Sequence, residues 1–124
     1  MSTQRSRTGK ADDRLVLMQG TLDVLILRTL LFGAEHGQGI ARAIQQTSDG
    51  ELLVDHGALY PALQRLEEKK LISAAWGTSA NNRRARYYTL TKAGRGHLAR
   101  QSSRWRRLAA AMARVLGPEP ELGS

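Results

Sequence analysis

Apolar residues recur at helical spacing along the first part of the chain, and turn-forming residues divide them into segments. The first apolar segment runs from Leu15 to Leu31, with a helix start expected at Gly20-Thr21. Residues 33–38 should end that helix, and residues 39–46 should form a second, shorter one. A turn and a short strand should then occupy residues 47–54. The pattern therefore predicts two helices before the middle of the chain.

A third helix should begin after Asp55, whose carboxylate can accept hydrogen bonds from the first free amides of a helix. Pro61 is tolerated near a helix start, because the amides there have no intrahelical partner. One face is apolar and should pack into the core: Leu59, Ala62, Leu63 and Leu66. The opposite face carries Tyr60 and Gln64 on its first two turns. Those side chains suit a helix whose N-terminal half lies in a DNA groove.

Two segments of alternating residues follow the third helix and indicate a β-hairpin. The first strand should include Ile72, Ala74 and Trp76 on one face, with Trp76 in the core of the hairpin. The second should carry Arg84, Arg86, Tyr88 and Leu90 on one face. A polar tip, TSANN, joins the two strands. The hairpin is therefore apolar towards the core and basic near its tip.

Thr91 can cap a long last helix, which should end near Leu116 before Gly117-Pro118. Apolar residues recur along one side of this helix: Leu98, Trp105, Leu108, Met112 and Val115. The rest of the helix is rich in arginine, and a domain this small has little surface of its own to cover the apolar side. We expect these five residues to form a homodimer interface. The alternative is packing against the first helix of the same chain, and the two can hold together.

Every acidic residue lies at or before Glu68 or in the tail, so that all ionised side chains from Lys69 to Pro118 are cationic. The 124 residues have a formal net charge of +8. Net charge alone does not define a partner, because many basic proteins bind nothing acidic in particular. A one-sided basic field on a helix and hairpin favours double-stranded DNA as the partner.

The composition also excludes several kinds of chemistry. The absence of cysteine excludes disulfides, thiolate zinc sites and cysteine redox sensing. The three histidines, His36, His56 and His97, have no metal-ligand spacing, and no nucleotide loop or paired catalytic residues are visible. We therefore expect neither an enzyme nor a metal or other cofactor. Without a signal-peptide core or a membrane-length apolar stretch, we expect a cytoplasmic protein that does not contact membranes.

Three helices, a short strand and a two-stranded wing define a winged helix-turn-helix. The expected fold is mainly α with a small β-hairpin: a winged helix-turn-helix DNA-binding domain over residues 14–90 and a C-terminal dimerisation helix over residues 91–116. Residues 1–13 should form a disordered basic arm, and residues 117–124 a disordered tail.

The segments GALYPALQRLEEKKLI and RRARYYTLTKAG closely resemble the PadR family of bacterial transcriptional regulators, and QGTLDVLILRTLL and HGQGI match its first two helices. The resemblance covers about Leu15 to Leu116. Its most specific part is Leu59-Tyr60-Pro61 followed by Arg65-Leu66-Glu67. The last helix resembles the short C-terminal helix of the smaller PadR proteins, some of which hold planar hydrophobic effectors between their subunits.

The resemblance implies a cytoplasmic homodimer whose third helices enter successive major grooves, while its wings lie along the backbone or the minor groove. It places Tyr60 against DNA at the head of the recognition helix, with Gln64 and Arg65 beside it. The DNA contacts expected on the wing are Asn82, Arg83, Arg84 and Arg86.

Two positions depart from the family pattern. Gln38 stands where an aromatic residue is common, so any role of that ring is missing in this chain. Lys70 occupies the place of a usual glycine after the recognition helix. If the backbone there is left-handed, lysine destabilises the fold by about 1 kcal/mol.

Three functional hypotheses follow from the sequence. The first is a sequence-specific repressor that binds a pseudo-palindromic operator as a homodimer and that a small planar effector could release. The second is an architectural DNA-coating protein without base readout, and the third is an interaction module for an acidic protein. Tyr60 and Gln64 favour the first over the second. Trp105 is most simply a packing residue, and its alternative role is a flat wall for the effector.

Overall fold

The structure is a computed structural model that describes residues 15–16 and 19–120. It is mainly helical with a small antiparallel sheet, as the sequence predicts. Within these residues the helices are α1 (Gln19–Leu30), α2 (Gly37–Thr47), α3 (His56–Glu68) and α4 (Lys92–Leu116). The strands are β1 (Leu15–Val16), β2 (Glu35–His36), β3 (Leu52–Leu53), β4 (Ile72–Thr78) and β5 (Arg84–Leu90). The expected basic arm lies outside the described residues, as does half of the expected tail, residues 121–124.

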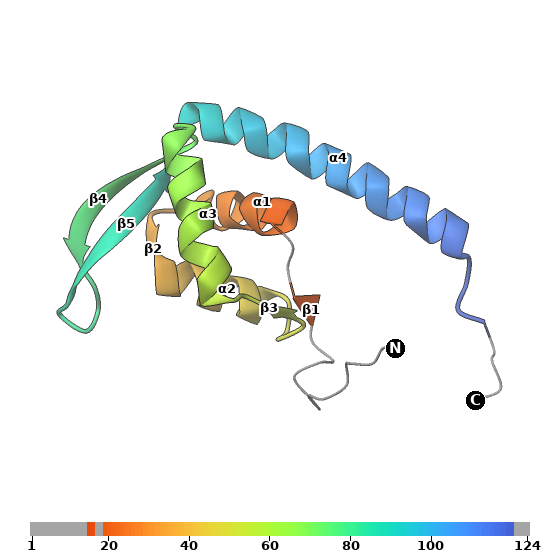
Figure 1. The fold of residues 1–124 in the computed structure, drawn as a ribbon, viewed down its shortest axis with the longest axis horizontal. Helices are drawn as coiled ribbons and strands as arrows, with labels where there is room; N and C mark the ends of the chain where they lie inside the picture. The colour runs from red at the N-terminus through yellow and green to blue at the C-terminus, as the bar shows by residue number, and fades with distance from the viewer. Residues whose placement is uncertain (1–14, 17–18, 121–124) are drawn as a thin grey trace.

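Helices α1, α2 and α3 form the body of the domain, and the β4–β5 hairpin projects from it as a wing (Figure 1). The largest fully buried side chains come from all three helices and the first residue of β4: Leu22, Ile26, Leu27, Ile40, Leu59, Leu63, Leu66 and Ile72. The four apolar residues predicted to face the core from α3 are all buried. Burial of this leucine-rich face fixes which side of α3 remains at the surface.

Local hydrogen bonds set the starts of three helices. Asp55 caps α3 by accepting from the backbone N–H of Gly57 at 3.2 Å, as predicted. Thr91 caps α4 in the same way, accepting from the Gly94 N–H at 3.0 Å. His36 caps α2 through its Nδ1, which accepts from the Gly39 N–H at 3.0 Å. Each cap satisfies an amide that has no partner within the helix.

The sheet contains one strand that the sequence pattern does not reveal. Residues Glu35–His36, expected only to interrupt the helices, form β2 and pair antiparallel with β5. The resulting order is β2-β5-β4, with Ile72 opposite Leu90 and Thr78 opposite Arg84 at the two ends of the hairpin. A second small sheet joins β1 to β3 in parallel. Strand β2 therefore ties the start of α2 to the wing.

Trp76 lies outside the hairpin core, contrary to the prediction. Ile72, Tyr88 and Leu90 are buried at the base of the hairpin, whereas the side chain of Trp76 is 62% exposed. Residue alternation correctly places these side chains on one face. The body of the domain, however, covers only the base of that face, so the outer half of the wing is solvated.

Lys70 has a left-handed backbone, with φ of 63°. The Lys70 N–H donates to the Glu67 carbonyl at 2.9 Å, and the Leu71 N–H donates to the Leu66 carbonyl at 3.0 Å. This pair of bonds is the glycine-favouring termination of a helix. The condition under which Lys70 destabilises the fold is therefore met.

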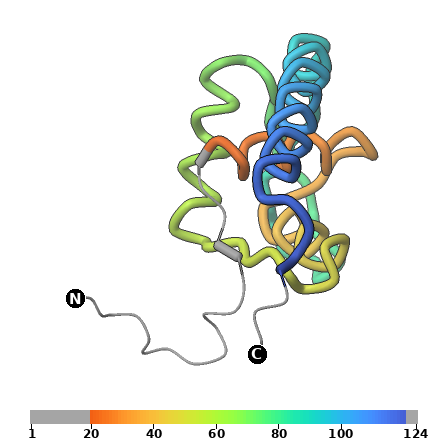
Figure 2. Tube along the Cα trace, turned by 90° about the vertical axis from the view of Figure 1, so that its right-hand side faces the viewer, coloured from red at the N-terminus to blue at the C-terminus, as the bar shows by residue number. Residues whose placement is uncertain are grey.

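Helix α4 begins against the body and then extends past it (Figures 1 and 2). Only Gly94 and Leu98 are buried along its length. Leu98, predicted to lie in a dimer interface, instead packs into the core of its own chain. For this residue the alternative, packing within one chain near α1, is the correct one, because it lies on the part of α4 that crosses the body.

Candidate nucleic-acid interface

The exposed face of α3 carries the side chains expected to meet DNA. Tyr60 is 46% exposed, and Gln64, one turn later, is also at the surface. The Tyr60 ring lies over the start of α2, where a β-carbon added to Gly37 would be 2.8 Å from the phenol oxygen. Glycine at position 37 thus makes room for Tyr60. Tyr60 and Gln64, one turn apart on α3, thus present a phenol and an amide at the surface.

The tip of the wing is a tight turn. The Asn82 N–H donates to the Ser79 carbonyl at 2.8 Å, and the Ser79 N–H donates to the Arg83 carbonyl at 2.7 Å. Asn82 closes this turn with φ of 64°, a conformation that asparagine tolerates better than most residues. The turn by itself accounts for asparagine at this position, and a DNA contact from Asn82 remains a prediction.

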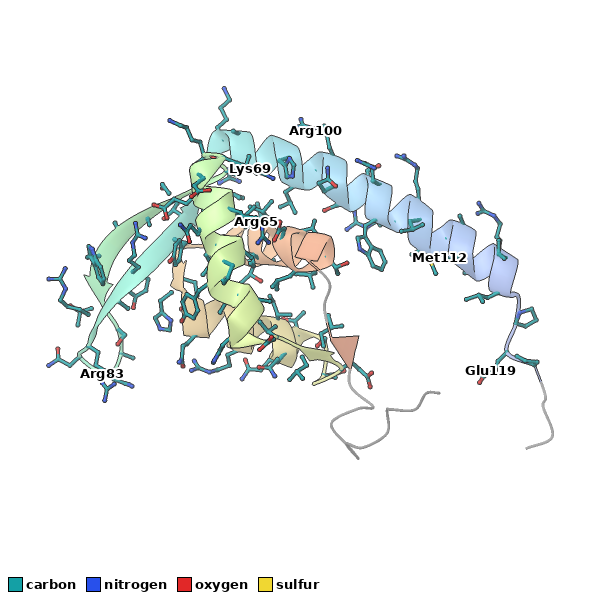
Figure 3. All side chains as sticks on the ribbon, in the orientation of Figure 1. Arg65, Lys69, Arg83, Arg100, Met112 and Glu119 are labelled. Carbon is teal, nitrogen blue, oxygen red and sulfur yellow. The ribbon has the colours of Figure 1, made fainter. Side chains whose placement is uncertain are left out.

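The three wing arginines have different surroundings. Arg86 donates from Nη2 to Glu67 Oε2 on α3 at 2.9 Å. The Arg84 guanidinium lies over the Trp76 ring, 4.8 Å from its centroid. Arg83 is exposed at the tip of the hairpin (Figure 3). The sequence pattern does not distinguish these arginines, whereas in the structure each has different neighbours.

Arg65 faces α1, and the DNA contact that the family resemblance implies for it remains a prediction. Its Nη2 donates to Asp23 Oδ1 on α1 at 2.9 Å, and its side chain is only 30% exposed. Its Nε is buried without a hydrogen-bond partner among the described residues. Burial raises the pKa of Asp23, and the neighbouring guanidinium opposes that rise. Arg65 therefore joins α3 to α1.

An open groove runs between the wing and the helices. One part is lined by residues at the start of α2, by Tyr60 and by the wing: His36, Gly37, Gln38, Arg42, Ser79, Ala80, Asn81, Arg83, Arg84, Ala85, Arg86 and Tyr88. The other part lies along α3 and includes Tyr60, Gln64, Glu67, Lys70 and Arg86. Tyr60, Arg86 and Tyr88 belong to both parts. The recognition face of α3 and the basic wing thus form the two walls of one groove.

Sequence reasoning missed Arg42 as a member of this groove. Arg42 is exposed and follows Gln38 by four residues, so both side chains lie on the same side of α2. That spacing is visible in the sequence, but only the pairing of β2 with β5 brings the start of α2 beside the wing. Gln38 is exposed in the same groove and offers an amide where the family commonly has a ring.

The far part of α4 carries an uncovered apolar surface. Trp105, Leu108, Met112 and Val115 are between 45% and 86% exposed within the described residues. Trp105 also borders an apolar cavity of about 410 Å³ between α1 and α4. Val24, Leu25 and Leu52 contribute to its lining, as do Arg28 and Arg106.

The described residues contain no helix long and apolar enough to cross a membrane. Within the same residues, no three histidine or acidic side chains gather as a metal site.

Comparison with known proteins identifies the family. Residues 26–100 match the model of the transcriptional regulator PadR-like family. The crystal structure of a PadR family transcription regulator from Clostridium difficile is 33% identical, with a TM-score of 0.64, over 77% of this chain and 98% of the other. A PadR-like transcription factor from Bacteroides fragilis is 27% identical, with a TM-score of 0.63, over 78% of this chain and 91% of the other. An uncharacterised protein of Lysinibacillus sphaericus is 29% identical over 72% of this chain and 82% of its own length. The chain therefore belongs to the PadR-like family of DNA-binding transcriptional regulators, which are not enzymes.

Proposed function

We propose that this regulator is a sequence-specific repressor that binds a pseudo-palindromic operator as a homodimer. The observation that carries this proposal is the exposure of Tyr60 and Gln64 on α3 in the groove shared with the wing arginines. A glutamine can bond both the N6 and N7 edges of adenine, which gives base discrimination in the major groove. Arginines on the facing wing supply phosphate contacts that hold the helix in place.

The far part of α4 supports the homodimer. Its exposed residues Trp105, Leu108, Met112 and Val115 recur along one side of the helix, and a second copy of the same side would cover them. Leu98 is left out of this interface, because it is buried within its own chain. A two-fold dimer places the recognition helices on half-sites about 34 Å apart, which requires a pseudo-palindromic operator.

A small organic effector is the third part of the proposal. The apolar cavity between α1 and α4 offers Trp105 as a flat wall, and Arg28 and Arg106 border it. A planar aromatic compound with an anionic group matches that lining. Binding that tilts α4 would change the spacing of the recognition helices and so reduce the affinity for the operator.

The repressor hypothesis is tested by a mobility-shift titration against DNA from upstream of the protein's own gene and against a scrambled duplex of the same length. At one fixed salt concentration, the upstream DNA should bind at least a hundredfold more tightly, given the usual ratio of specific to non-specific affinity of about 10³ or more. Equal affinities would instead support the architectural DNA-coating protein. Absence of any shift would support the protein-interaction module.

The effector is tested by tryptophan fluorescence in a Trp76→Phe variant, where Trp105 is the remaining tryptophan. Saturable quenching by a planar aromatic acid, accompanied by release of bound DNA, is the expected result. A Trp105→Phe variant serves as the matched control and should lose the signal. Quenching without DNA release would remove the compound from regulation.

A further inference from the structure

Trp76 is the least explained residue of the wing. Trp76 is 62% exposed on a strand whose buried residue, Ile72, lies four positions earlier. A single exposed aromatic side chain requires no function by itself. Trp76, however, does not stand alone, because the Arg84 guanidinium lies over its ring at 4.8 Å from the centroid.

The stack leaves Arg84 able to bind a further partner. Contact with an aromatic ring uses the flat face of the guanidinium, and its N–H donors point outwards along the edges. Arg86 differs, because one of its donors is already bonded to Glu67. Arg84 is thus held in place by Trp76 while its hydrogen-bonding edges remain available. Such a side chain loses less conformational entropy when it binds.

The pair lies on the side of the wing that faces the recognition helix. In the hairpin register Trp76 is opposite Arg86, and Arg84 is opposite Thr78, so that their side chains share one face. On this face Arg86 reaches Glu67 of α3. The same face, two residues further towards the tip, therefore carries the Trp76–Arg84 stack.

The arrangement of α3 and the wing defines which part of a duplex the stack meets. The two elements form opposite walls of one groove in the protein. That groove can hold the sugar-phosphate strand that separates the major groove of a duplex from its minor groove. With α3 in the major groove, the wing faces the adjacent minor groove. That groove is only about 6 Å wide, so a single extended side chain enters it more readily than a whole hairpin.

We propose that Trp76 and Arg84 form a minor-groove reader that makes this regulator prefer A·T-rich DNA beside its major-groove site. Narrow A·T-rich minor grooves have an enhanced negative potential that attracts arginine. Arg84 supplies the charge and the donors, and the indole of Trp76 orients it and packs against the sugars. The proposal rests on the proposed binding of α3 in the major groove, and it adds a preference at base pairs that α3 does not contact.

The test compares three duplexes that share one centre and differ only in their flanks. The centre is selected by the wild-type protein from a random duplex library, and the flanks contain A·T, G·C or inosine·C pairs. Inosine lacks the 2-amino group of guanine, so inosine·C resembles G·C in the major groove and A·T in the minor groove. The wild type should bind the A·T and inosine·C flanks about tenfold more tightly than the G·C flanks. Equal binding to inosine·C and G·C flanks would overturn the proposal.

Variants of the stack make the test specific. Trp76→Ala and Arg84→Ala should reduce the flank ratio to about one, and Arg84→Lys should reduce it as well, because lysine lacks the planar group that stacks. Trp76→Phe should retain most of the preference. Arg83→Ala is the matched control: it should weaken binding to all three duplexes equally and leave the ratio unchanged. A ratio that survives Trp76→Ala would show that the stack does not read the flanks.

Two further measurements distinguish failure of this proposal from misfolding of the variants and from failure of the proposed base readout by α3. Thermal unfolding checks that the variants fold, which is expected because both side chains are exposed. If selection enriches no common centre, the proposed base readout by α3 fails. An arbitrary centre then serves the flank comparison equally well, because the potential in the minor groove does not depend on α3. A flank preference in that case would support the reader alone.

Discussion

Lys70 occupies a backbone conformation that favours glycine, with φ of 63°. Its neighbour Lys69 has φ of −82° and caps the same helix in an ordinary right-handed conformation. Two adjacent, exposed lysines therefore differ in their backbone geometry. This pair allows a matched measurement of how much a non-glycine residue in a left-handed conformation lowers the free energy of unfolding.

Lys70→Gly should stabilise the protein by about 1 kcal/mol, because it removes the steric strain of a β-carbon in the left-handed region. Lys69→Gly should destabilise it, because glycine there only adds freedom to the unfolded chain. Urea denaturation of the three proteins gives both free energies of unfolding. A loss of stability in Lys70→Gly would contradict the expected strain.

The Asp23–Arg65 pair has a consequence for the pH dependence of stability. Burial raises the pKa of Asp23 above its ordinary value of 3.8, and this outweighs the opposing effect of Arg65. The folded state thus binds the Asp23 proton more readily than the unfolded state does. Its contribution to stability is present below the unfolded pKa and is lost as pH rises through the folded pKa.

We therefore expect the wild type to lose stability relative to Asp23→Asn as the pH rises through the window just above 3.8. Denaturation curves at several acidic pH values measure that difference. An NMR titration of the Asp23 carboxyl group gives the folded pKa directly. A folded pKa below 3.8 would mean that the Arg65 charge dominates the burial.

At the scale of the elements, the crossing of α4 over the start of β4 depends on Gly94. Gly94 is buried in the first turn of α4, and a β-carbon there would collide with the Leu71 carbonyl oxygen and approach the Leu90 side chain. Gly96, two residues later, has only the flexible end of Arg100 near the corresponding position. Close packing therefore excludes a side chain at position 94 but not at position 96.

Gly94→Ala should destabilise the protein by about 1–3 kcal/mol, because α4 must move away from the backbone of Leu71. Gly96→Ala should instead stabilise it by roughly 0.5–1 kcal/mol, because alanine favours the helix interior. Chemical denaturation measures both changes. Equal effects at the two positions would exclude close packing as the reason for Gly94.

Local signals in the sequence predicted the elements well. The caps Asp55 and Thr91 and the apolar face of α3 were predictable, because each depends on residues a few positions apart. The strand β2 was not, because two residues carry no periodicity and it forms only by pairing with β5. The order of the elements, three helices followed by a hairpin, predicted the winged helix, and the family resemblance agreed with it.

The candidate site was less predictable than the fold. Helical periodicity placed Tyr60 and Gln64 on the exposed face correctly. It could not show that Arg65 pairs with Asp23, which lies 42 residues away in the sequence. Strand alternation likewise placed Trp76 on the correct face but could not show where the body of the domain stops covering it.

At the scale of the whole molecule, the far part of α4 is an exposed apolar surface that a second copy of the chain would cover. Met112→Glu combined with Val115→Glu should convert the proposed dimer into a monomer, because burying two unpaired carboxylates is unfavourable by several kcal/mol. Sedimentation at several protein concentrations measures the assembly. Ala110→Glu is the control, because Ala110 is exposed and lies two residues from Met112, on the other side of the helix. A double variant that stays dimeric would move the interface elsewhere.

Thr91 joins three elements at one point. Its hydroxyl lies 2.8 Å from the carbonyl of Lys70 and 3.0 Å from that of Leu71, where α3 ends and β4 begins. From that joint, the 25 residues of α4 extend as one rigid rod, which is roughly 37 Å long at 1.5 Å per residue. A rotation of only about 5° at the joint displaces the far end by about 3 Å, close to the rise of one base pair. In the proposed dimer held by α4, a small rotation about Thr91 would thus change by about one base pair the DNA spacing that the two recognition helices can match.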